Sequence, residues 1–291
     1  MSLSARRRAL VIAGSSVLAG FTLMAPAYAA TSGHSTAPAV TTVTAGPHTP
    51  DGAAVQPGGV SHLVGPARTH PGARNATTTS TNWSGYAATG NNGAFSSISA
   101  SWIEPTGVCR SGQQYSSFWV GLDGYNSNSV EQTGSEVDCS GSTPQYYSWY
   151  EMYPAYPVNF SDTVRPGDHF TGSVTFTGGS SFTLKLSDTT RGWSHTVTKT
   201  LSGAARSSAE VIAEAPCCTA SGGILPLADF GRVSFSGSTA NGATLSTFNP
   251  VGINMVSANG VAEDSVSALS GGGFNATWLS SGNGRRGGTR G

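Results

Sequence analysis

Carboxylates set among apolar residues are the groups of this chain whose surroundings favour chemistry. Glu151 lies in the aromatic run 147–154, and Glu210 and Glu214 lie in an otherwise apolar run that ends at Pro216. Such surroundings shift the pKa of a carboxyl group, which makes these residues candidates for proton transfer. On a strand, Glu210 and Glu214 would share a face about 13 Å apart, too far to form one catalytic pair. The alternative is an edge strand whose acids face solvent.

A second stretch combines polar and apolar residues in the same way. The segments 117–124 and 130–134 read as two strands around a polar turn at 125–129, with Asp123 and Gln132 near the two ends of the turn. Aromatic residues nearby in sequence either line a cleft for an extended polymer, polypeptide or polysaccharide, or belong to the core. They are Trp83, Trp102, Trp119, Trp149, Tyr150 and Tyr153.

Familiar hydrolase signatures are missing from the sequence. It contains no G-x-S-x-G elbow, no H-E-x-x-H helix and no Asp-Thr-Gly or Asp-Ser-Gly pair. Only His169 and His195 follow residue 82, and we expect both to be exposed turn or strand residues rather than members of a Ser-His-Asp triad. Neither is accompanied by a cluster with metal-ligand spacing, so we expect no metal and no cofactor.

The elements that must position these groups are short strands. Apolar residues alternate with period two at 98–102, 170–176, 182–186 and 233–235, and no helical period is present. Turn residues at 165–168, 178–179 and 188–192 separate the strands. This pattern predicts one all-β domain, a β-sandwich or barrel of about 200 residues.

The N-terminus has the pattern of an export signal. Arg6-Arg7-Arg8 precedes an apolar run, and Ala27-Tyr28-Ala29 resembles a cleavage site, so we expect a signal peptide at 1–29 and a secreted protein. The apolar run is short for a membrane anchor. Residues 30–81 lack large apolar side chains and are predicted to be a disordered linker or a propeptide. We expect the folded domain at 82–280 and a disordered Gly/Arg tail at 281–291.

Charge is unevenly distributed along the chain. Five of the 15 basic residues but only one of the 15 acidic residues precede residue 82, so the folded domain is acidic. An acidic domain argues against nucleic acid as a partner, because nucleic-acid binding needs basic patches. We expect neither nucleic acid nor membrane as a partner, and a monomer.

All four cysteines lie in the folded domain. Cys109 and Cys139 flank the stretch around Gln132 and could close a loop worth about 3–4 kcal/mol. Cys217 and Cys218 are adjacent, so they could form a strained vicinal bridge or remain thiols.

Seven sequence blocks resemble, in order, those of the glutamic peptidase (eqolisin) family. The resemblance covers roughly 82–235, nearly all of the folded domain. The blocks are Asn82-Trp83-Ser84-Gly85-Tyr86, Trp119-Val120-Gly121-Leu122-Asp123-Gly124, Gln132-Thr133-Gly134, Trp149-Tyr150-Glu151 with Tyr153-Pro154, Pro166-Gly167-Asp168, Ala209-Glu210 through Glu214, and Ala228-Asp229-Phe230-Gly231.

The resemblance implies a β-sandwich of two large antiparallel sheets, jelly-roll or lectin-like, with the active site on its concave face. It implies a secreted, pepstatin-insensitive acid endopeptidase whose catalytic pair is Gln132 and Glu214, the second acid of its block. Glu214 would act as general base and acid on water, and the neutral Gln132 amide would donate to the oxyanion. The substrate would be a polypeptide, and the propeptide would inhibit the enzyme. The cleft residues implied are Trp119, Asp123, Glu136, Trp149, Glu151 and Tyr153.

The sequence departs from the family pattern at four places. The turn before Gln132 is one residue shorter, Glu136 replaces an aspartate, and Val211 and Met152 replace tryptophans. We expect the loss of two indoles to change the shape of the substrate subsites. The competing interpretations are a carbohydrate-binding sandwich module and an inactive relative that binds peptides.

Overall fold

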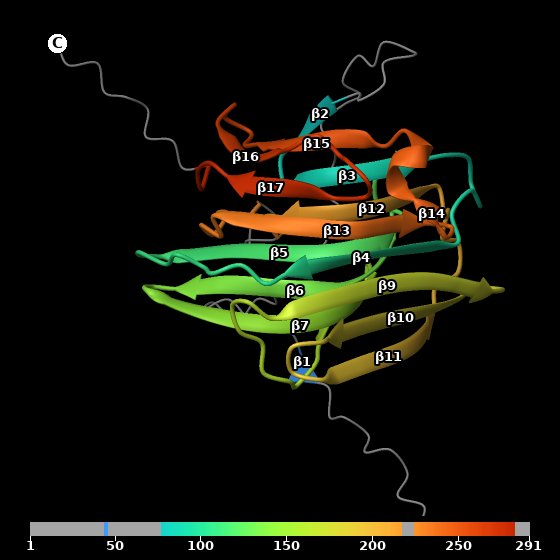
Figure 1. Cartoon of the computed structure of the whole chain (residues 1–291), viewed down its shortest axis with the longest axis horizontal. Coiled ribbons are helices and arrows are strands. Elements are labelled where there is room, and N and C mark those ends of the chain that lie inside the picture. Colours follow the sequence, from blue (N-terminus) through green and yellow to red (C-terminus); the bar gives the residue numbers. More distant parts are fainter. Residues whose placement is uncertain (1–43, 46–76, 217–223, 283–291) are drawn as a thin grey trace, which may run out of the picture. The chain divides into compact units, whose positions relative to one another are not determined.

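The computed structural model describes residues 44–45, 77–216 and 224–282 of the 291-residue chain. These residues form strands, with one short 3₁₀ helix, η1 (Leu245–Phe248). None of the helices among them has the length and apolar character needed to cross a bilayer. The predicted all-β fold is confirmed (Figure 1).

The strands form two layers of antiparallel pairs. The first layer has the order β8 (Val158–Asn159), β7 (Thr143–Tyr153), β6 (Val130–Ser140), β5 (Gln113–Leu122), β12 (Ser208–Glu214), β3 (Trp83–Thr89) and β15 (Val251–Val256). The second has the order β11 (Trp193–Thr200), β10 (Ser181–Asp188), β9 (His169–Gly178), β4 (Ser97–Ile103), β13 (Arg232–Ala240), β17 (Phe274–Trp278) and β16 (Ala262–Val266).

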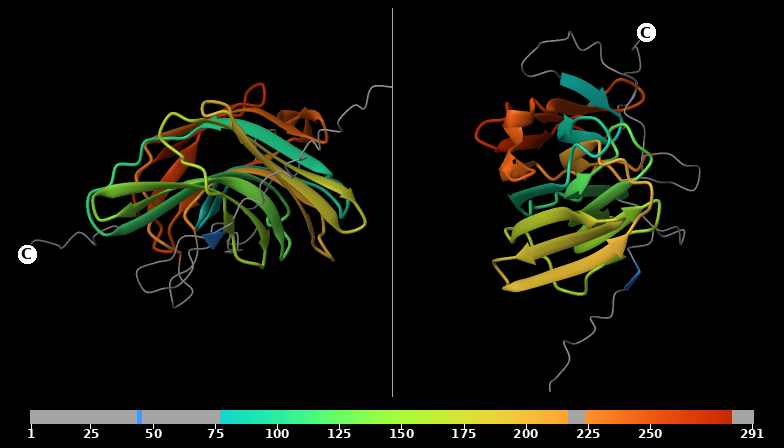
Figure 2. Two further views of the ribbon diagram at one scale, coloured as in Figure 1. Left: turned by 90° about the horizontal axis from the view of Figure 1, so that it is seen from below. Right: turned by 90° about the vertical axis from the view of Figure 1, so that its right-hand side faces the viewer.

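Short strands extend and join these layers. β15 also pairs with β16, so the two layers belong to one continuous network of hydrogen-bonded strands. β1 (Thr44–Ala45) adds to β8, β2 (Thr77–Ser80) runs parallel to β15, and β14 (Ala243–Thr244) pairs with β13. β2 precedes residue 82, so the sheet begins ahead of the expected start of the domain. The long strands are visibly bent (Figure 2).

The main hydrophobic core lies between the two layers. The first layer contributes alternate residues such as Phe118 and Val120 of β5, and the second contributes Phe170 and Val174 of β9. This is the period-two alternation that the sequence predicted. The residues between them in β5, β6, β7 and β12 therefore face away from the second layer, and this outer face of the first layer carries the candidate site.

Two residues expected to shape the substrate subsites belong to the inner face instead. Val211 and Met152 are buried in the core between the layers. The expectation that their replacement of tryptophan alters the cleft is therefore wrong. Because Glu210 and Glu151, their neighbours in sequence, face outward, the alternation of the strand turns Val211 and Met152 inward. These two substitutions change core packing.

Candidate active site

Strand register aligns the candidate side chains in rows across the outer face of the first layer. Glu210, Gly121, Gln132 and Glu151 are successive partners on β12, β5, β6 and β7. A second row, four residues further along each strand, contains Glu214, Ser117 and Glu136 in the same strand order. The sheet thus gathers residues from four strands, and all six polar members of the two rows are buried.

Glu214 ends β12, a central strand. β12 pairs with β3 on one side and β5 on the other, and both Glu210 and Glu214 are fully buried. The alternative interpretation of an edge strand with solvent-facing acids is therefore wrong. Side chains of the neighbouring strands β3 and β5 flank Glu210 and Glu214 on both sides, which an edge strand would not allow.

Asn82 and Trp119 donate hydrogen bonds to the Glu214 carboxylate. Asn82 Nδ2 donates to Oε1 over 3.1 Å, and Trp119 Nε1 donates to Oε2 over 2.8 Å. The two donors approach from β5 and from the residue just before β3, so each carboxylate oxygen is oriented by a different strand neighbour. Asn82 was not among the predicted site residues. The signal available in the sequence was its position at the head of a block that contains Trp83 and Gly85.

Gln132 is joined to Glu151 on the next strand. Its Nε2 donates to Glu151 Oε2 over 2.6 Å, and both side chains are fully buried. Burial raises the pKa of Glu151 well above its usual range, and the nearby charge of Glu214 raises it further. Gln132 and Glu214 are therefore connected through Glu151, by a hydrogen bond on one side and by charge on the other.

Glu136 lies in the same row as Glu214, with the small Ser117 between them. Burial raises the pKa of Glu136 well above its usual range, and Asp138, Glu104 and Glu151 add to the effect. Like charges this close disfavour ionisation of every member. Two carboxyl groups of β6, Glu136 and Asp138, thus have raised pKa values on the face that also carries Gln132.

Aromatic side chains form a separate cluster on this face. Trp83, Trp119 and Trp149 pack together with Ile212, and Tyr153 packs against them from its half-buried position. Trp83 and Trp119 meet edge to face with ring centroids 5.0 Å apart. Of the predicted cleft residues, the structure thus brings together Trp119, Trp149 and Tyr153 beside the two rows of polar groups.

Asp123 binds backbone N–H groups, unlike the aromatic residues predicted to line the cleft. Its carboxylate accepts hydrogen bonds from the backbone N–H groups of Arg206, at 2.6 Å, and Ser207, at 2.9 Å. Its own backbone has a φ of 69°, a left-handed conformation that an aspartate tolerates at a turn. Asp123 therefore fixes the segment that leads into β12, and so acts on the register of Glu210 and Glu214.

Glu104 is a buried carboxyl group that no sequence pattern singled out. It lies behind β6, on the inner face of the layer, where Ser135 donates to Oε2 and Trp102 Nε1 donates to Ser135 over 2.8 Å. Burial raises the pKa of Glu104 to about 8, with a contribution from the charge of Asp168. Its partner Ser135 adjoins Glu136 in the chain, so Glu104 lies on the opposite face of β6 from the candidate site.

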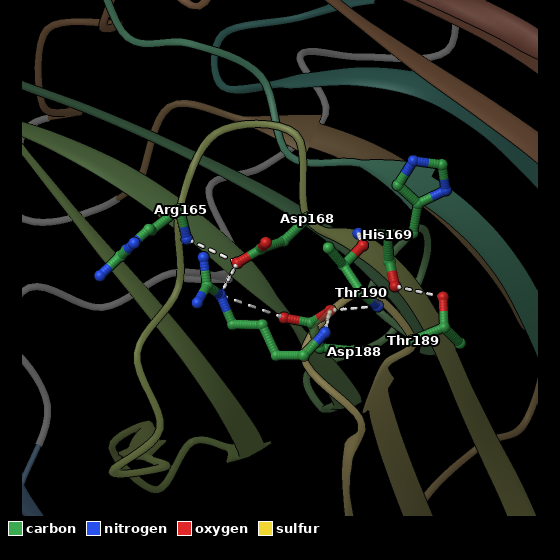
Figure 3. Close-up of polar contacts among 7 residues, drawn as sticks. Arg165, Asp168, His169, Asp188, Thr189 and Thr190 are labelled. Atoms are coloured by element: carbon green, nitrogen blue, oxygen red, sulfur yellow. Dashed lines mark hydrogen bonds and ion pairs between the residues drawn. The ribbon is translucent and has the colours of Figure 1, made fainter.

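The two histidines are engaged elsewhere. The His195 ring stacks on Phe160 with centroids 4.3 Å apart, and its Nε2 contacts Asp162. His169 makes its contacts with Thr189 and Thr190 through its backbone, and its ring points away from them (Figure 3). No serine among the described residues is hydrogen-bonded to either ring, so the part of the chain that the structure describes offers no Ser-His-Asp triad.

Cys109 and Cys139 form a disulfide, as the sequence suggested. Cys139 lies near the end of β6, so the bridge ties this strand to the segment before β5. Cys217 and Cys218 lie outside the described residues.

The fold and the outer face define an all-β sandwich protein whose site consists of carboxyl and amide side chains. The model of the peptidase A4 family matches residues 81–278, and the chain belongs to this family. Aspergillopepsin-2 from Aspergillus niger is 34% identical to it over 146 residues, which are 47% of this chain and 50% of that protein. The chain therefore spans about half the length of this curated relative.

Solved structures of eqolisins share the fold, which confirms the predicted resemblance. Scytalido-glutamic peptidase with a transition state analog inhibitor is 26% identical, with a TM-score of 0.60 over 69% of this chain and 100% of that chain. SCP-B, a member of the eqolisin family in a complex with the tripeptide Ala-Ile-His, is 24% identical with a TM-score of 0.57. It covers the same shares of the two chains and supports the fold alone.

Proposed function

We propose that this chain is a secreted acid endopeptidase in which Glu214 and Gln132 hydrolyse the peptide bond. The observation that carries the proposal is the placement of the two side chains in the family's β-sandwich. Both are buried on one face of the same sheet, and each is held by a hydrogen bond from or to a neighbouring strand. A protein that only bound sugars would gain nothing from burying a carboxylate and an amide, each held by hydrogen bonds, on one face of a sheet.

The proposed reaction uses water as the nucleophile and needs no cofactor. Glu214 takes a proton from water as the oxygen attacks the carbonyl carbon, and the Gln132 N–H donates to the oxygen that becomes negative. Glu214 then returns the proton to the departing nitrogen as the C–N bond breaks. The products are a carboxylic acid and an amine, and no covalent enzyme intermediate forms.

The donors to Glu214 support this role. Asn82 donates to one oxygen of the carboxylate and Trp119 donates to the other, which fixes the direction in which the carboxylate faces. These hydrogen bonds also favour the ionised form, which a general base requires. The aromatic cluster beside it, with Trp149 and Tyr153, offers apolar contact to a polypeptide substrate.

Digestion of a denatured protein at pH 3–4 with pepstatin present tests the proposal. Wild type should cleave, and Glu214→Gln and Gln132→Ala should lose activity by a factor of about 10² or more, because each removes a group required in the transition state. Glu210→Gln removes an equally buried carboxyl group of the same strand and serves as the matched control. Full activity in either dyad variant contradicts the assignment, and an inactive wild type favours peptide or carbohydrate binding.

We further propose that residues 30–81 act as an inhibitory propeptide. β1 pairs with β8 and β2 pairs with β15, so two parts of this segment are attached at opposite ends of the first layer. The strands that carry Gln132 and Glu214 lie between these two attachments. The segment also contains four histidines with Arg68 and Arg74, which gain or keep positive charge in acid, whereas the folded domain is acidic in composition.

Acid treatment of the secreted precursor tests the propeptide. Its mass should fall at pH 3–4, and activity should rise with the loss of the residues ahead of β2, whereas Glu214→Gln should keep the precursor mass if cleavage is by the enzyme itself. A precursor that is fully active before any shortening contradicts inhibition. Gel filtration at the same pH tests the expected monomer, and the mass of the exported protein tests the expected signal peptide at 1–29.

A further inference from the structure

Gln132 has one polar side chain beside it in its cross-strand row. Its partner on β7 is Glu151, and its partner on β5 is Gly121, which has no side chain. A Cβ added to Gly121 would lie 3.2 Å from the Gln132 Cβ and 2.8 Å from Trp119 Cζ3. The sheet is therefore closed to a side chain on one flank of Gln132, and Glu151 is the lateral neighbour on the other.

The hydrogen bond between Gln132 and Glu151 involves one polar atom of each side chain. Gln132 Nε2 donates to Glu151 Oε2 over 2.6 Å. Oε1 of Gln132 and Oε1 of Glu151 are buried and make no hydrogen bond with any described residue. One amide N–H is thus occupied by Glu151, while the second N–H and the carbonyl oxygen of the amide are left to other partners.

The orientation of a primary amide decides what it can do. A turn of 180° about the last side-chain bond exchanges its NH₂ group and its oxygen, and the two orientations fill the same volume. An oxyanion needs the NH₂ group, because the carbonyl oxygen would repel it. Without a fixed partner both orientations would be populated, and one of them would be inactive.

Glu151 is suited to select one orientation. A carboxyl oxygen that accepts a hydrogen bond attracts the Nε2 side of the amide and disfavours the Oε1 side. The backbone around Glu151 is held on both sides, because Tyr150 and Met152 are packed in the core between the layers. In addition, Thr133 Oγ1, next to Gln132, donates to the Trp149 carbonyl over 2.7 Å, which fixes β6 against β7.

We propose that Glu151 is the positioning residue that fixes the amide of Gln132, with its NH₂ group turned toward Glu151 and its second N–H available to the oxyanion. This inference rests on the proposed function, because it assigns the amide the role of oxyanion donor. Glu151 acts through Gln132 and does not itself exchange a proton with the substrate.

Two substitutions of similar volume at Glu151 distinguish the effect of its hydrogen-bond acceptor from the effect of its packing. Glu151→Gln keeps a carbonyl oxygen that can accept from Gln132, whereas Glu151→Leu fills a similar volume with apolar atoms and offers no acceptor. We expect kcat to fall less than about 10-fold in Glu151→Gln and about 10²-fold in Glu151→Leu, with KM changed less than about 3-fold. The same pair of substitutions at Glu210, on the other flank of Gly121, should give no such difference between Gln and Leu.

A spectroscopic readout reports the amide directly. The side-chain NH₂ signals of Gln132, assigned by their loss in Gln132→Ala, should show one N–H protected from solvent exchange in wild type and in Glu151→Gln. If Glu151→Leu is folded, this protection should be lost. Equal activity of Glu151→Leu and Glu151→Gln, or unchanged protection in Glu151→Leu, overturns the proposal.

Two further outcomes can be interpreted, an unfolded Glu151→Leu variant and an active Gln132→Ala variant. If circular dichroism shows that Glu151→Leu does not fold, Glu151→Gln decides: retained protection with retained activity supports positioning, and retained protection with lost activity overturns it. If Gln132→Ala is fully active, the proposed dyad fails, and the protection measurement still shows whether Glu151 holds the amide. The two failures are therefore distinguishable.

Discussion

Trp119 Nε1 donates a 2.8 Å hydrogen bond to Glu214 Oε2, although 95 residues separate them in the chain. The contact exists because β5 and β12 are adjacent, with Trp119 opposite Ile212 and Ser117 opposite Glu214. The indole reaches along the strand direction over the small Ser117. A residue expected only to line a cleft thus holds the proposed catalytic carboxylate.

Replacing Trp119 by Phe should lower kcat by about 10- to 100-fold, because a hydrogen bond to a charged group contributes about 1.5–3 kcal/mol. Steady-state kinetics at pH 3–4 measures the effect. Trp149→Phe is the matched control, since Trp149 belongs to the same cluster and its Nε1 has no hydrogen-bond partner among the described residues. A Trp149→Phe variant as impaired as Trp119→Phe would show that indole packing, rather than the bond to Glu214, is responsible.

Stability should fall as the pH rises from about 4.5 to about 8. Burial raises the pKa of Glu104 and of Glu131 to about 8, from an ordinary value of 4.5. In this interval the unfolded chain releases these protons while the folded chain keeps them, so raising the pH favours unfolding. Urea unfolding at pH 4, 6 and 8 measures the decline.

Glu104→Gln isolates one contribution to this decline. The amide stays neutral at every pH, so the free energy of unfolding should drop less between pH 4 and pH 8 than in wild type, by an amount on the order of 3–5 kcal/mol. Asp229→Asn, which alters a partly exposed carboxylate, gives the background. A pH dependence in Glu104→Gln identical to that of wild type would contradict the role of this group.

The disulfide should stabilise the domain by about 3–4 kcal/mol, as expected from the chain entropy of a loop whose ends are 30 residues apart. Urea unfolding of the Cys109→Ser/Cys139→Ser variant measures this difference. Wild type in a reducing agent should approach the variant. Any effect of the reducing agent on the variant itself would come from Cys217 and Cys218, and an unchanged midpoint in the variant would contradict the prediction.

Gly134→Ala should destabilise the protein by about 1–3 kcal/mol. A Cβ at this position would lie 2.3 Å from the Phe118 carbonyl oxygen and 2.6 Å from Trp119 Cβ, so β5 would have to move. Gly252→Ala is the matched control within a strand, because its Cβ would meet only side-chain atoms, at 3.3 Å or more. Thermal unfolding of the two variants compares them, and an equal loss in both would show that a general effect of alanine in a strand, rather than the contact with β5, is responsible.

Period-two alternation was sufficient to predict an all-β sandwich or barrel with a hairpin, because it reports which residues face the core, and the family resemblance favoured the sandwich. It placed Val233 and Phe235 on a strand and a turn between β10 and β11, both as found. It could not tell a central strand from an edge strand, since the partners of β12 lie in β3 and β5, far away in the chain. The burial of Glu210 and Glu214 follows from those partners and from nothing local.

The individual contacts of the site also could not be predicted from local sequence patterns. The sequence resemblance selected Gln132, Glu151 and Glu214, but their pairing depends on strand register. The inward direction of Met152 follows from strand alternation and could have been deduced once Glu151 was assigned to the outer face. Asn82 required the three-dimensional position of the segment just before β3.

The arrangement around Asn82 limits where the N-terminal segment can be cut. Ser80 Oγ donates to Asn82 Oδ1 over 3.1 Å and accepts from the backbone N–H of Trp83 over 3.1 Å, while Asn82 Nδ2 holds Glu214. Ser80 ends β2, which is held along β15 from Thr77 onward. Trimming past Thr77 would therefore remove the support of the contact between Asn82 and Glu214. If the N-terminal segment is cleaved as proposed, we expect the cut to leave β2 attached to the sheet.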